Sequence, residues 1–353
     1  MQTMLVSAQD IRAQAEQLKQ TEPRLRERDL AQRLGISEAA YLQAHIGLGI
    51  SRLKPAFENI MQSMALLEEV LLITRGDAVV HEITGSYRDL HVKNGIGIAM
   101  GQVDVRLFLR NWHYGFVLDE PYTQRRSLQF FDAYGVAVHK VFATDETDLM
   151  AWNRLVQTYV DHHDAGDMDI WMMPSPLIHD AQLSDSEIER YRQDWDALQE
   201  VHEFYELLKG YALDTNRIRA FELAGANRAY RLHTDSVEQL MTALSLNEVA
   251  SKIIVGNSGC VQIFSGVIKQ LVRYGKWFNV LDPHFNLHLD TDSISQVWLI
   301  KRPSRYGQIT SIEAFDAQGE TILTLFGVPD GITAEPDGWR EVLNALPKLE
   351  LSS

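Results

Sequence analysis

The feature that most limits the folds open to this 353-residue chain is an internal repeat. The segment FFDAYG at 130–135 matches AFDAQG at 314–319 in four of six positions, an offset of 184 residues. Without a gap, the same offset aligns two further pairs of segments: HYGFVL (113–118) with VWLIKR (297–302), and VDVRLF (103–108) with LHLDTD (287–292). Shorter offsets align LEEV (67–70) with LNEV (246–249), and RGDAVVHEITG (75–85) with GNSGCVQIFSG (256–266). Several matches in one order indicate a tandem duplication.

The expected elements follow the same order in both halves. In the first half we expect helices up to residue 50, a helix over 57–76, strands from about 78 to 142 and a helix near 145–160. In the second half we expect helices at 186–210, 214–224 and 235–250, followed by strand-like segments between 259 and 327. This order predicts an α+β fold built as a tandem structural repeat, in which each half is a large antiparallel β-sheet with packed helices. The predicted domains are residues 1–172 and 173–353.

Composition excludes several classes of protein. The chain carries 48 acidic and 33 basic side chains, a formal charge of −15, which disfavours general nucleic-acid binding and anionic lipid surfaces. No apolar run is long enough to cross a bilayer and the N-terminus lacks a basic leader, so we expect no membrane insertion and a cytoplasmic location. The single cysteine, Cys260, excludes an intramolecular disulfide, a CxxC redox centre and thiolate zinc sites.

One segment imitates a DNA-binding motif. RDLAQRLGISEAAYLQAHIG at 28–47 has the pattern of a helix-turn-helix with Gly35 at the turn. Its second helix offers Glu38, Gln43 and His45 but no lysine or arginine, whereas DNA readers need cationic and base-reading side chains there. Two packed helices joined by a glycine turn are the expected structure.

His202 raises the question of a ligand. The stretch DALQEVHEFYELLKGY (196–211) is predicted as part of a helix, and Trp195, Leu198, His202 and Tyr205 would share one helical face. A histidine in such a stripe is either a packed residue at the edge of the core or a ligand to a metal.

Cations near this helix favour the second alternative. We expect the next helix to start at Asp214 as its N-cap, with Arg217 and Arg219 in its first turns, where positive charge opposes the helix dipole. The segment 297–308 adds Lys301, Arg302 and Arg305. An aromatic slot, a neutral imidazole and local cations suit a flat apolar ligand with a central metal and carboxylates on its rim, which describes haem.

Other motifs carry less weight. GIGIAMG (95–101) has the wrong glycine spacing for a dinucleotide loop, and GxSxG, Walker A and HExxH motifs are absent from the sequence. His162 and His163, flanked by Asp161 and Asp164, are either a divalent-metal site or a solvated loop, and we favour the loop.

Four segments taken together resemble one family. VHEFYELLKGY, VGNSGCVQIFSG, FNLHLDTDSISQVWLIKRP and VDVRLFLRNWHYGFVLD resemble the bacterial cytoplasmic hemin-degrading or haem-trafficking factors of the HemS/ChuS/PhuS type, and the likeness runs from about residue 20 to 345. The resemblance implies two similar halves and one haem b in a cleft bordered by the C-terminal half.

The resemblance also assigns residues. It implies His202 as the axial ligand of the haem iron, Arg106 as the distal residue with Phe108 beside it, and Arg110 in place of Arg106 if the register differs. It implies Arg217 and Lys301 near the haem propionates, followed by Arg219 and Arg302. If a second histidine takes part, the candidates are His81, His113 and His288.

Three functions are open at this point. The protein is a carrier that receives haem from importer components and passes it to a haem oxygenase or another acceptor, or it is a haem-degrading enzyme in which Arg106 is catalytic. Because the sequence has no flavin or nicotinamide motif, such an enzyme would need an external reductant. A non-haem ligand-binding or regulatory module is the third alternative. A monomer and a homodimer are both compatible with the sequence, and so is a second haem site in the N-terminal half.

Overall fold

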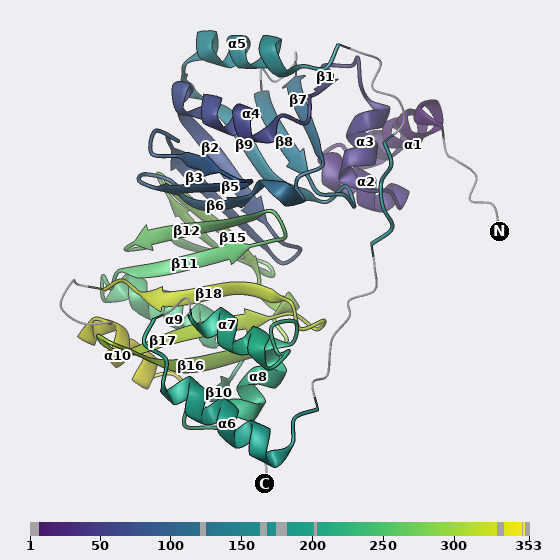
Figure 1. Cartoon of the computed structure of the whole chain (residues 1–353). Helices are drawn as coiled ribbons and strands as arrows, with labels where there is room; N and C mark the ends of the chain where they lie inside the picture. Colours follow the sequence, from purple (N-terminus) through teal and green to yellow (C-terminus); the bar gives the residue numbers. More distant parts are fainter. Residues whose placement is uncertain are drawn as a thin grey trace. The chain divides into compact units, whose positions relative to one another are not determined.

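The computed structural model describes residues 7–120, 125–162, 168–173, 182–200, 203–329, 335–347 and 349. The chain forms two compact units (Figure 1). Unit 1 comprises residues 1–75, 82–173 and 256–262, and unit 2 comprises residues 76–81, 174–255 and 263–353. Each unit therefore contains a short segment from the other half of the sequence. The predicted division at residue 172 stays a prediction.

The N-terminal half of the chain begins with helices and continues into strands. Its elements are α1 (Ala8–Thr21), α2 (Glu27–Leu34), α3 (Glu38–Ala44), β1 (Ile50–Arg52), α4 (Phe57–Ser63), the 3-10 turn η1 (Met64–Leu66), β2 (Glu68–Arg75), β3 (Val79–Gly85), β4 (His91–Lys93), β5 (Ile96–Met100), β6 (Asp104–Phe108), η2 (Leu109–Asn111), β7 (Tyr114–Glu120), β8 (Arg125–Phe131), β9 (Ala137–Thr147) and α5 (Leu149–Tyr159).

The C-terminal half repeats this order. Its elements are α6 (Asp185–Asp196), α7 (Glu203–Gly210), α8 (Arg217–Ala224), β10 (Ala229–Leu232), α9 (Ser236–Leu246), β11 (Ser251–Gly256), β12 (Cys260–Gly266), β13 (Leu271–Tyr274), β14 (Trp277–Asp282), β15 (Phe285–Asp290), η3 (Thr291–Ser293), β16 (Gln296–Ser304), β17 (Gly307–Phe315), β18 (Thr321–Gly327) and α10 (Asp337–Asn344).

The strand order confirms the tandem repeat. In unit 1 the antiparallel strands run β1-β7-β8-β9-β2, and in unit 2 they run β10-β16-β17-β18-β11. Each unit also contains a three-stranded antiparallel meander, β4-β5-β6 in unit 1 and β13-β14-β15 in unit 2. The fold is therefore α+β with an antiparallel sheet in each repeat, as the sequence predicts.

The matched segments that identify the repeat form identical turns. After β8, the carboxylate of Asp132 accepts hydrogen bonds from the backbone N–H groups of Tyr134 and Val136 at 3.0 Å. After β17, Asp316 does the same for Gln318 and Glu320 at 2.9 Å. In both turns the glycine of the motif has a positive φ, 72° and 82°, which L-residues with a side chain rarely adopt.

The gapless offset of 184 is wrong upstream of these turns. Tyr114 on β7 pairs with Phe131, but the residue that pairs with Phe315 is Gln296, only 182 positions after Tyr114. The hairpin between β16 and β17 is two residues longer than its counterpart, which accounts for the shift. The structure therefore matches HYGFVL with 295–300, and VDVRLF with 285–290. The alignment of 75–85 with 256–266 is confirmed, because β3 and β12 begin and end 181 residues apart.

Two predicted helices are interrupted. The helix expected over 57–76 ends at Ser63, and β2 follows because its side chains alternate between buried and half-buried positions and pair with β9. The helix expected over 186–210 is split into α6 and α7. At the break, the carboxylate of Glu203 accepts hydrogen bonds from the backbone N–H groups of Gln199 and Glu200, at 2.7 and 3.0 Å, so these groups do not continue the helix.

Corresponding helices cover corresponding strands. In unit 1 side chains of α1, α2 and α3 pack with Phe116 of β7 and Phe131 of β8. In unit 2 side chains of α6, α7 and α8 pack with Trp298 of β16 and Phe315 of β17 (Figure 1). The expected pair of packed helices at 28–47 is α2 and α3, joined at Gly35 with φ of 68°. Within the described ranges, the structure has no helix long and apolar enough to cross a membrane.

Candidate functional site

The outer face of the β4–β6 meander combines an arginine with exposed apolar side chains. On β6, Val105 and Leu107 are fully buried, so Arg106 and Phe108 project from the opposite face. Phe108 is 37% exposed.

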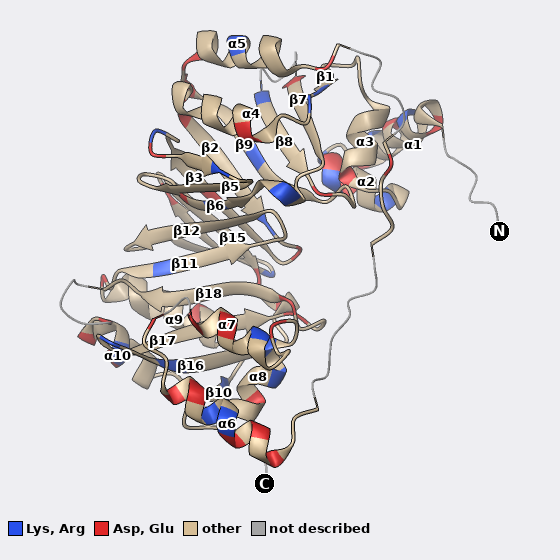
Figure 2. Cartoon of the chain, in the orientation of Figure 1, with Lys and Arg blue, Asp and Glu red and all other residues tan. Residues whose placement is uncertain are grey.

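The neighbouring strand β5 extends this apolar surface. Ile96 pairs with Phe108 and Ile98 pairs with Arg106, and both isoleucines are exposed, as is Met100 at 72%. We call Ile96, Ile98, Met100, Arg106 and Phe108 the β4–β6 face. Figure 2 shows charged residues gathered on helices such as α6, whereas the strands carry few of them. Such an apolar strand surface is suited to a flat apolar ligand.

Arg106 is oriented by its own hairpin. Its Nη1 donates to the Asp104 carboxylate at 2.6 Å and to the carbonyl oxygens of Ala99 and Val105 at 3.0 Å each. All three bonds use one nitrogen, so Nε and Nη2 keep hydrogens with which to contact a ligand. The Arg106 side chain is 30% exposed and can therefore reach a ligand on the β4–β6 face.

Arg110, the alternative to Arg106, lies elsewhere. It belongs to η2, beyond the end of β6, and does not share the alternation that places Arg106 beside Phe108. Arg110 and Glu58 instead line a hollow of about 340 Å³ beside α4. The structure thus groups Arg106, and not Arg110, with the apolar face.

His202, the predicted iron ligand, lies outside the described residues, as does Val201. The described neighbours on α7 show the two sides of that helix: Phe204 is buried in the core of unit 2, whereas Tyr205 is 54% exposed. Because α6 ends at Asp196, the single helical face predicted to join Trp195 to Tyr205 does not form.

Arg217 is held by a buried carboxylate. It starts α8, and its guanidinium makes bidentate contacts with Glu313 of β17, with Nη2 donating to Oε1 at 2.7 Å and Nε donating to Oε2 at 3.0 Å. The Glu313 side chain is 1% exposed. Arg217 also stacks on the ring of Phe204 at 5.6 Å, next to the α7 segment that follows His202.

Arg302 lies beside this pair and is fully buried. It is positioned over the rings of Phe204 and Phe326, and its Nη2 donates to Ser311 at 2.7 Å. Burial lowers the pKa of Arg302 to about 10, although Glu313 opposes the shift. Arg302 is therefore a structural cation of the core.

Lys301 does not join these arginines. Successive strand residues face opposite sides, so Lys301 projects away from the side of β16 that carries Arg302. Its Nζ lies over the ring of Tyr230 on β10, at 5.6 Å. The two cations predicted to hold the propionates, Arg217 and Lys301, are thus on different faces of the sheet in unit 2.

The start of α8 differs from the prediction. Its N-cap is Asn216 and not Asp214, because the Asn216 side chain accepts a hydrogen bond from the backbone N–H of Arg219 at 3.0 Å. The Arg219 side chain contacts Glu222 one turn along the helix at 3.2 Å.

The alternative histidines occupy three different environments. His81 is fully buried with its Nε2 3.2 Å from the carbonyl oxygen of Ile253, and burial lowers its pKa to about 3. His113 is exposed beside Trp171. His288 is half-buried on β15 with its Nδ1 2.7 Å from Oδ1 of Asn279.

Sequence reasoning missed a buried polar network in unit 1. His139 lies between Tyr87, whose hydroxyl is 2.5 Å from Nε2, and Thr74, whose hydroxyl is 3.1 Å from Nδ1. The Thr74 hydroxyl also donates to Gln262 at 2.8 Å and lies 3.2 Å from the thiol sulfur of Cys260. Burial lowers the pKa of His139 to about 3, so it is neutral in the folded protein. The network draws on four separate strands and loops, so no local sequence pattern points to it.

The predicted loop histidines are only partly described. Asp161 and His162 are described, whereas His163 and Asp164 lie outside the described residues. Among the residues with a determined placement, no three histidine, cysteine, aspartate or glutamate side chains come together in a way that could hold a metal ion.

Comparisons with known proteins agree on one family. The model of the haemin-degrading HemS.ChuX domain matches residues 35–159 and 214–346. The hemin transport protein HmuS of Yersinia pestis is 32% identical over 341 residues, which cover 96% of this chain and 97% of HmuS.

Two solved structures match almost the whole chain. The apo form of PhuS, a heme-binding protein from Pseudomonas aeruginosa, is 34% identical with a TM-score of 0.91, over 97% of this chain and all of PhuS. The heme degrading enzyme ChuS of Escherichia coli O157:H7 is 29% identical with a TM-score of 0.89, also over 97% of this chain and all of ChuS. The chain is a member of the HemS/ChuX family of haemin-utilisation proteins.

Proposed function

We propose that this protein is a cytoplasmic haem carrier, with His202 as a ligand to the haem iron, and that the β4–β6 face is a surface on which haem b can rest. The observation that carries this proposal is the β4–β6 face itself, where exposed apolar side chains surround an oriented arginine. The solved relatives support haem as the ligand, because PhuS is a heme-binding protein and ChuS is a heme degrading enzyme.

Each proposed residue has a chemical reason for its role. An imidazole with an ordinary pKa near 6.5 is largely neutral at pH 7 and can donate its lone pair to iron. Arg106 would supply hydrogen-bond donors to a haem on the β4–β6 face, while its bonds to Asp104 and to two carbonyl groups limit its movement. Phe108 and Ile96 would cover the macrocycle, whose burial supplies much of the affinity.

The contacts of Arg217 and Lys301 support Arg217 as the better candidate for a propionate partner. Arg217 stacks on Phe204, two positions after His202, so we propose Arg217 as the cation closest to a haem bound there. Arg217 also forms an ion pair with Glu313. Lys301 projects from the other face of β16 and is the weaker candidate.

Carrying haem is favoured over degrading it by the pattern of relatives. HmuS, described as a transport protein, and PhuS, described as heme-binding, are 32% and 34% identical to this chain, whereas ChuS is 29% identical. Degradation would also need an external reductant, for which the sequence offers no flavin or nicotinamide site. We propose haem importer components as donors and a haem oxygenase or a similar protein as the acceptor.

A hemin titration followed by visible absorption tests the ligand. The wild type should give a Soret band that the His202→Ala variant shifts or loses, and Arg106→Ala should change the band while the protein still binds haem. His284→Ala is the matched control, because His284 is an exposed histidine in the turn between β14 and β15. Identical spectra for wild type and His202→Ala would refute His202 as the iron ligand.

Adding ascorbate in air to the loaded protein separates carrier from enzyme. For a carrier, the Soret band should persist and the haem should move to apo-myoglobin added afterwards. Steady loss of the Soret band with release of iron, abolished in Arg106→Ala, would instead support the enzymatic alternative with Arg106 as the catalytic residue.

A further inference from the structure

The β13–β15 meander of unit 2 is the repeat counterpart of the β4–β6 meander. Both begin with a tight hairpin in which two residues separate the paired strands, and this fixes the correspondence. Arg106 pairs with Ile98 in the first meander, and His288 pairs with Asn279 in the second. A histidine therefore stands in unit 2 where unit 1 has its candidate distal arginine.

The side chains around His288 form a second apolar strand surface. Strand alternation places Val272, Tyr274, Trp277 and Leu281 on the side of the meander that carries His288. Tyr274 is 80% exposed, Val272 46% and Leu281 37%. We call Val272, Tyr274, Trp277, Leu281 and His288 the β13–β15 face. The side chains on the opposite side, Phe278, Val280, Leu287 and Leu289, are buried.

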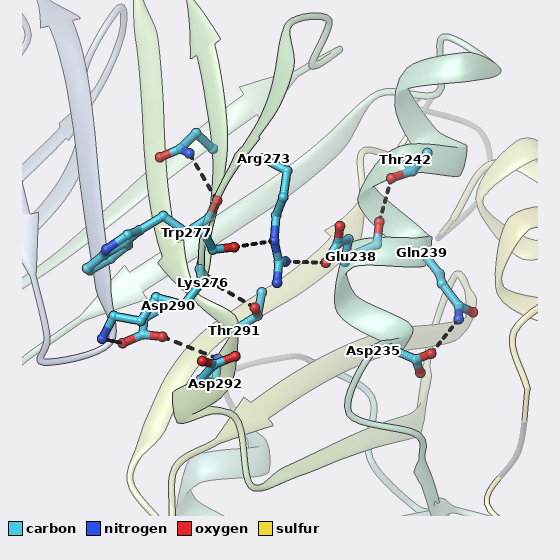
Figure 3. A network of polar contacts seen from close by, with 12 residues as sticks. Asp235, Glu238, Gln239, Thr242, Arg273, Lys276, Trp277, Asp290, Thr291 and Asp292 are labelled. Atoms are coloured by element: carbon cyan, nitrogen blue, oxygen red, sulfur yellow. Dashed lines mark hydrogen bonds and ion pairs between the residues drawn. The ribbon is translucent and has the colours of Figure 1, made fainter.

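Helix α9 occupies the opposite side of this meander. Figure 3 shows Arg273 turned toward α9, where its guanidinium contacts Glu238 at 2.5 Å, while the indole of Trp277 points away from the helix. Beside Trp277, the ammonium group of Lys276 contacts Asp290 at 2.6 Å. The contacts of α9 thus leave the β13–β15 face open to a ligand.

The imidazole of His288 is oriented for metal ligation. The amide nitrogen of Asn279 donates to the carbonyl oxygens of Val272 and Trp277, at 2.9 and 3.2 Å, so its Oδ1 is the atom that faces His288. At 2.7 Å from this oxygen, Nδ1 of His288 must carry the proton. The Nε2 atom then holds a free lone pair. Metal-binding histidines are typically oriented in this way by a second residue.

We propose that the β13–β15 face binds a second iron porphyrin, with Nε2 of His288 as an axial ligand. An apolar surface with an oriented imidazole along one side suits a planar metallo-tetrapyrrole, and a free metal ion would find a single ligand there. The choice of porphyrin rests on the proposed function, and the site itself is separate from His202. We expect weaker binding than at His202, because Lys276, a nearby cation, is already paired with Asp290.

Hemin titration of the full chain, with variants at each histidine, tests this site. The wild type should bind two haems in separable steps. His288→Ala should remove only the weaker step, and His202→Ala only the stronger. Asn279→Ala should weaken the second step by about 10-fold, since it removes only the residue that orients His288. His284→Ala is again the control and should leave both steps unchanged.

Iron-free protoporphyrin IX distinguishes ligation from simple adsorption to an apolar surface. It cannot bond to an imidazole, so its binding should not respond to His288→Ala. A second step that survives His288→Ala, or a wild type that binds a single haem lost in His202→Ala, would overturn the second site. The latter outcome would leave the proposed function standing, whereas failure of His202→Ala to alter any step would refute His202 as the iron ligand and leave the second site standing.

Discussion

Among the described residues, two fully buried histidines make the stability of this protein depend on pH in a predictable direction. His81 and His139 are each at most 1% exposed, and burial lowers the pKa of each to about 3. In the unfolded chain a histidine has a pKa near 6.5. Between pH 6.5 and 3, the unfolded state therefore binds a proton at each site that the folded state does not, and the free energy of unfolding falls as the pH is lowered.

The size of this effect follows from the two pKa values. Each histidine should cost about 1.4 kcal/mol per pH unit below 6.5. Lowering the pH from 7 to 5 should therefore reduce the free energy of unfolding by about 2 kcal/mol per histidine, or about 4 kcal/mol for the pair. Replacing His139 removes one of the two contributions, so the His139→Gln variant should lose about 2 kcal/mol less than wild type over this range.

Urea unfolding followed by tryptophan fluorescence at pH 7, 6 and 5 measures this difference. His139→Gln will be less stable at pH 7, because it disturbs hydrogen bonds to Tyr87 and Thr74, but only the pH slope bears on the argument. His284→Gln, at an exposed position, should keep the wild-type slope. A wild-type slope in His139→Gln would show that His139 does not resist protonation in the fold and would refute the reasoning.

Three further predictions concern packing and burial. Gly259→Ala should destabilise unit 1 by about 1–3 kcal/mol in a thermal melt, because the new Cβ would lie 2.6 Å from Cβ of Val138. Gly210→Ala is the matched comparison: its new Cβ would meet open space, so the substitution should stabilise α7 by about 0.5–1 kcal/mol. Arg217→Met should cost about 3–5 kcal/mol, because the buried Glu313 loses its hydrogen-bonded ion-pair partner, and adding Glu313→Leu should recover part of the loss; equal stability of the single and double variants would contradict this. Burial raises the pKa of the Cys260 thiol to about 12, so Ellman's reagent at pH 8 should react with it only after unfolding, and rapid labelling of the native protein would contradict its burial.

The architecture could be predicted from the sequence because the internal repeat is recognisable without knowledge of any contact in the structure. Matching FFDAYG to AFDAQG identifies a turn that depends only on local residues, an aspartate and a glycine with positive φ. The gapless extension fails upstream because hairpin length changes without leaving a signal in either flanking strand. The split between α6 and α7 was equally hidden, since it depends on the side chain of Glu203 accepting bonds from backbone groups that a helical pattern assigns elsewhere.

In the candidate site, too, local features could be predicted from the sequence and long-range contacts could not. Alternation along β6 is a local property, and it places Arg106 and Phe108 on the same face of the strand, while their roles toward haem stay predictions. Whether Arg217 and Lys301 lie close together depends on which face of β16 is covered by α8. The sequence does not reveal this. The pairing of Arg217 with Glu313 likewise joins residues 96 positions apart.

The exchange of short segments between the two units has a consequence for how this protein can change over time. Residues 76–81 belong to unit 2 and residues 256–262 to unit 1, so each compact unit draws a piece of its structure from the other half of the gene. Cutting the chain at its midpoint would deprive both products of a segment. A chain that has lost or exchanged one half alone is therefore expected not to form both compact units. We expect the two halves to be kept together in evolution.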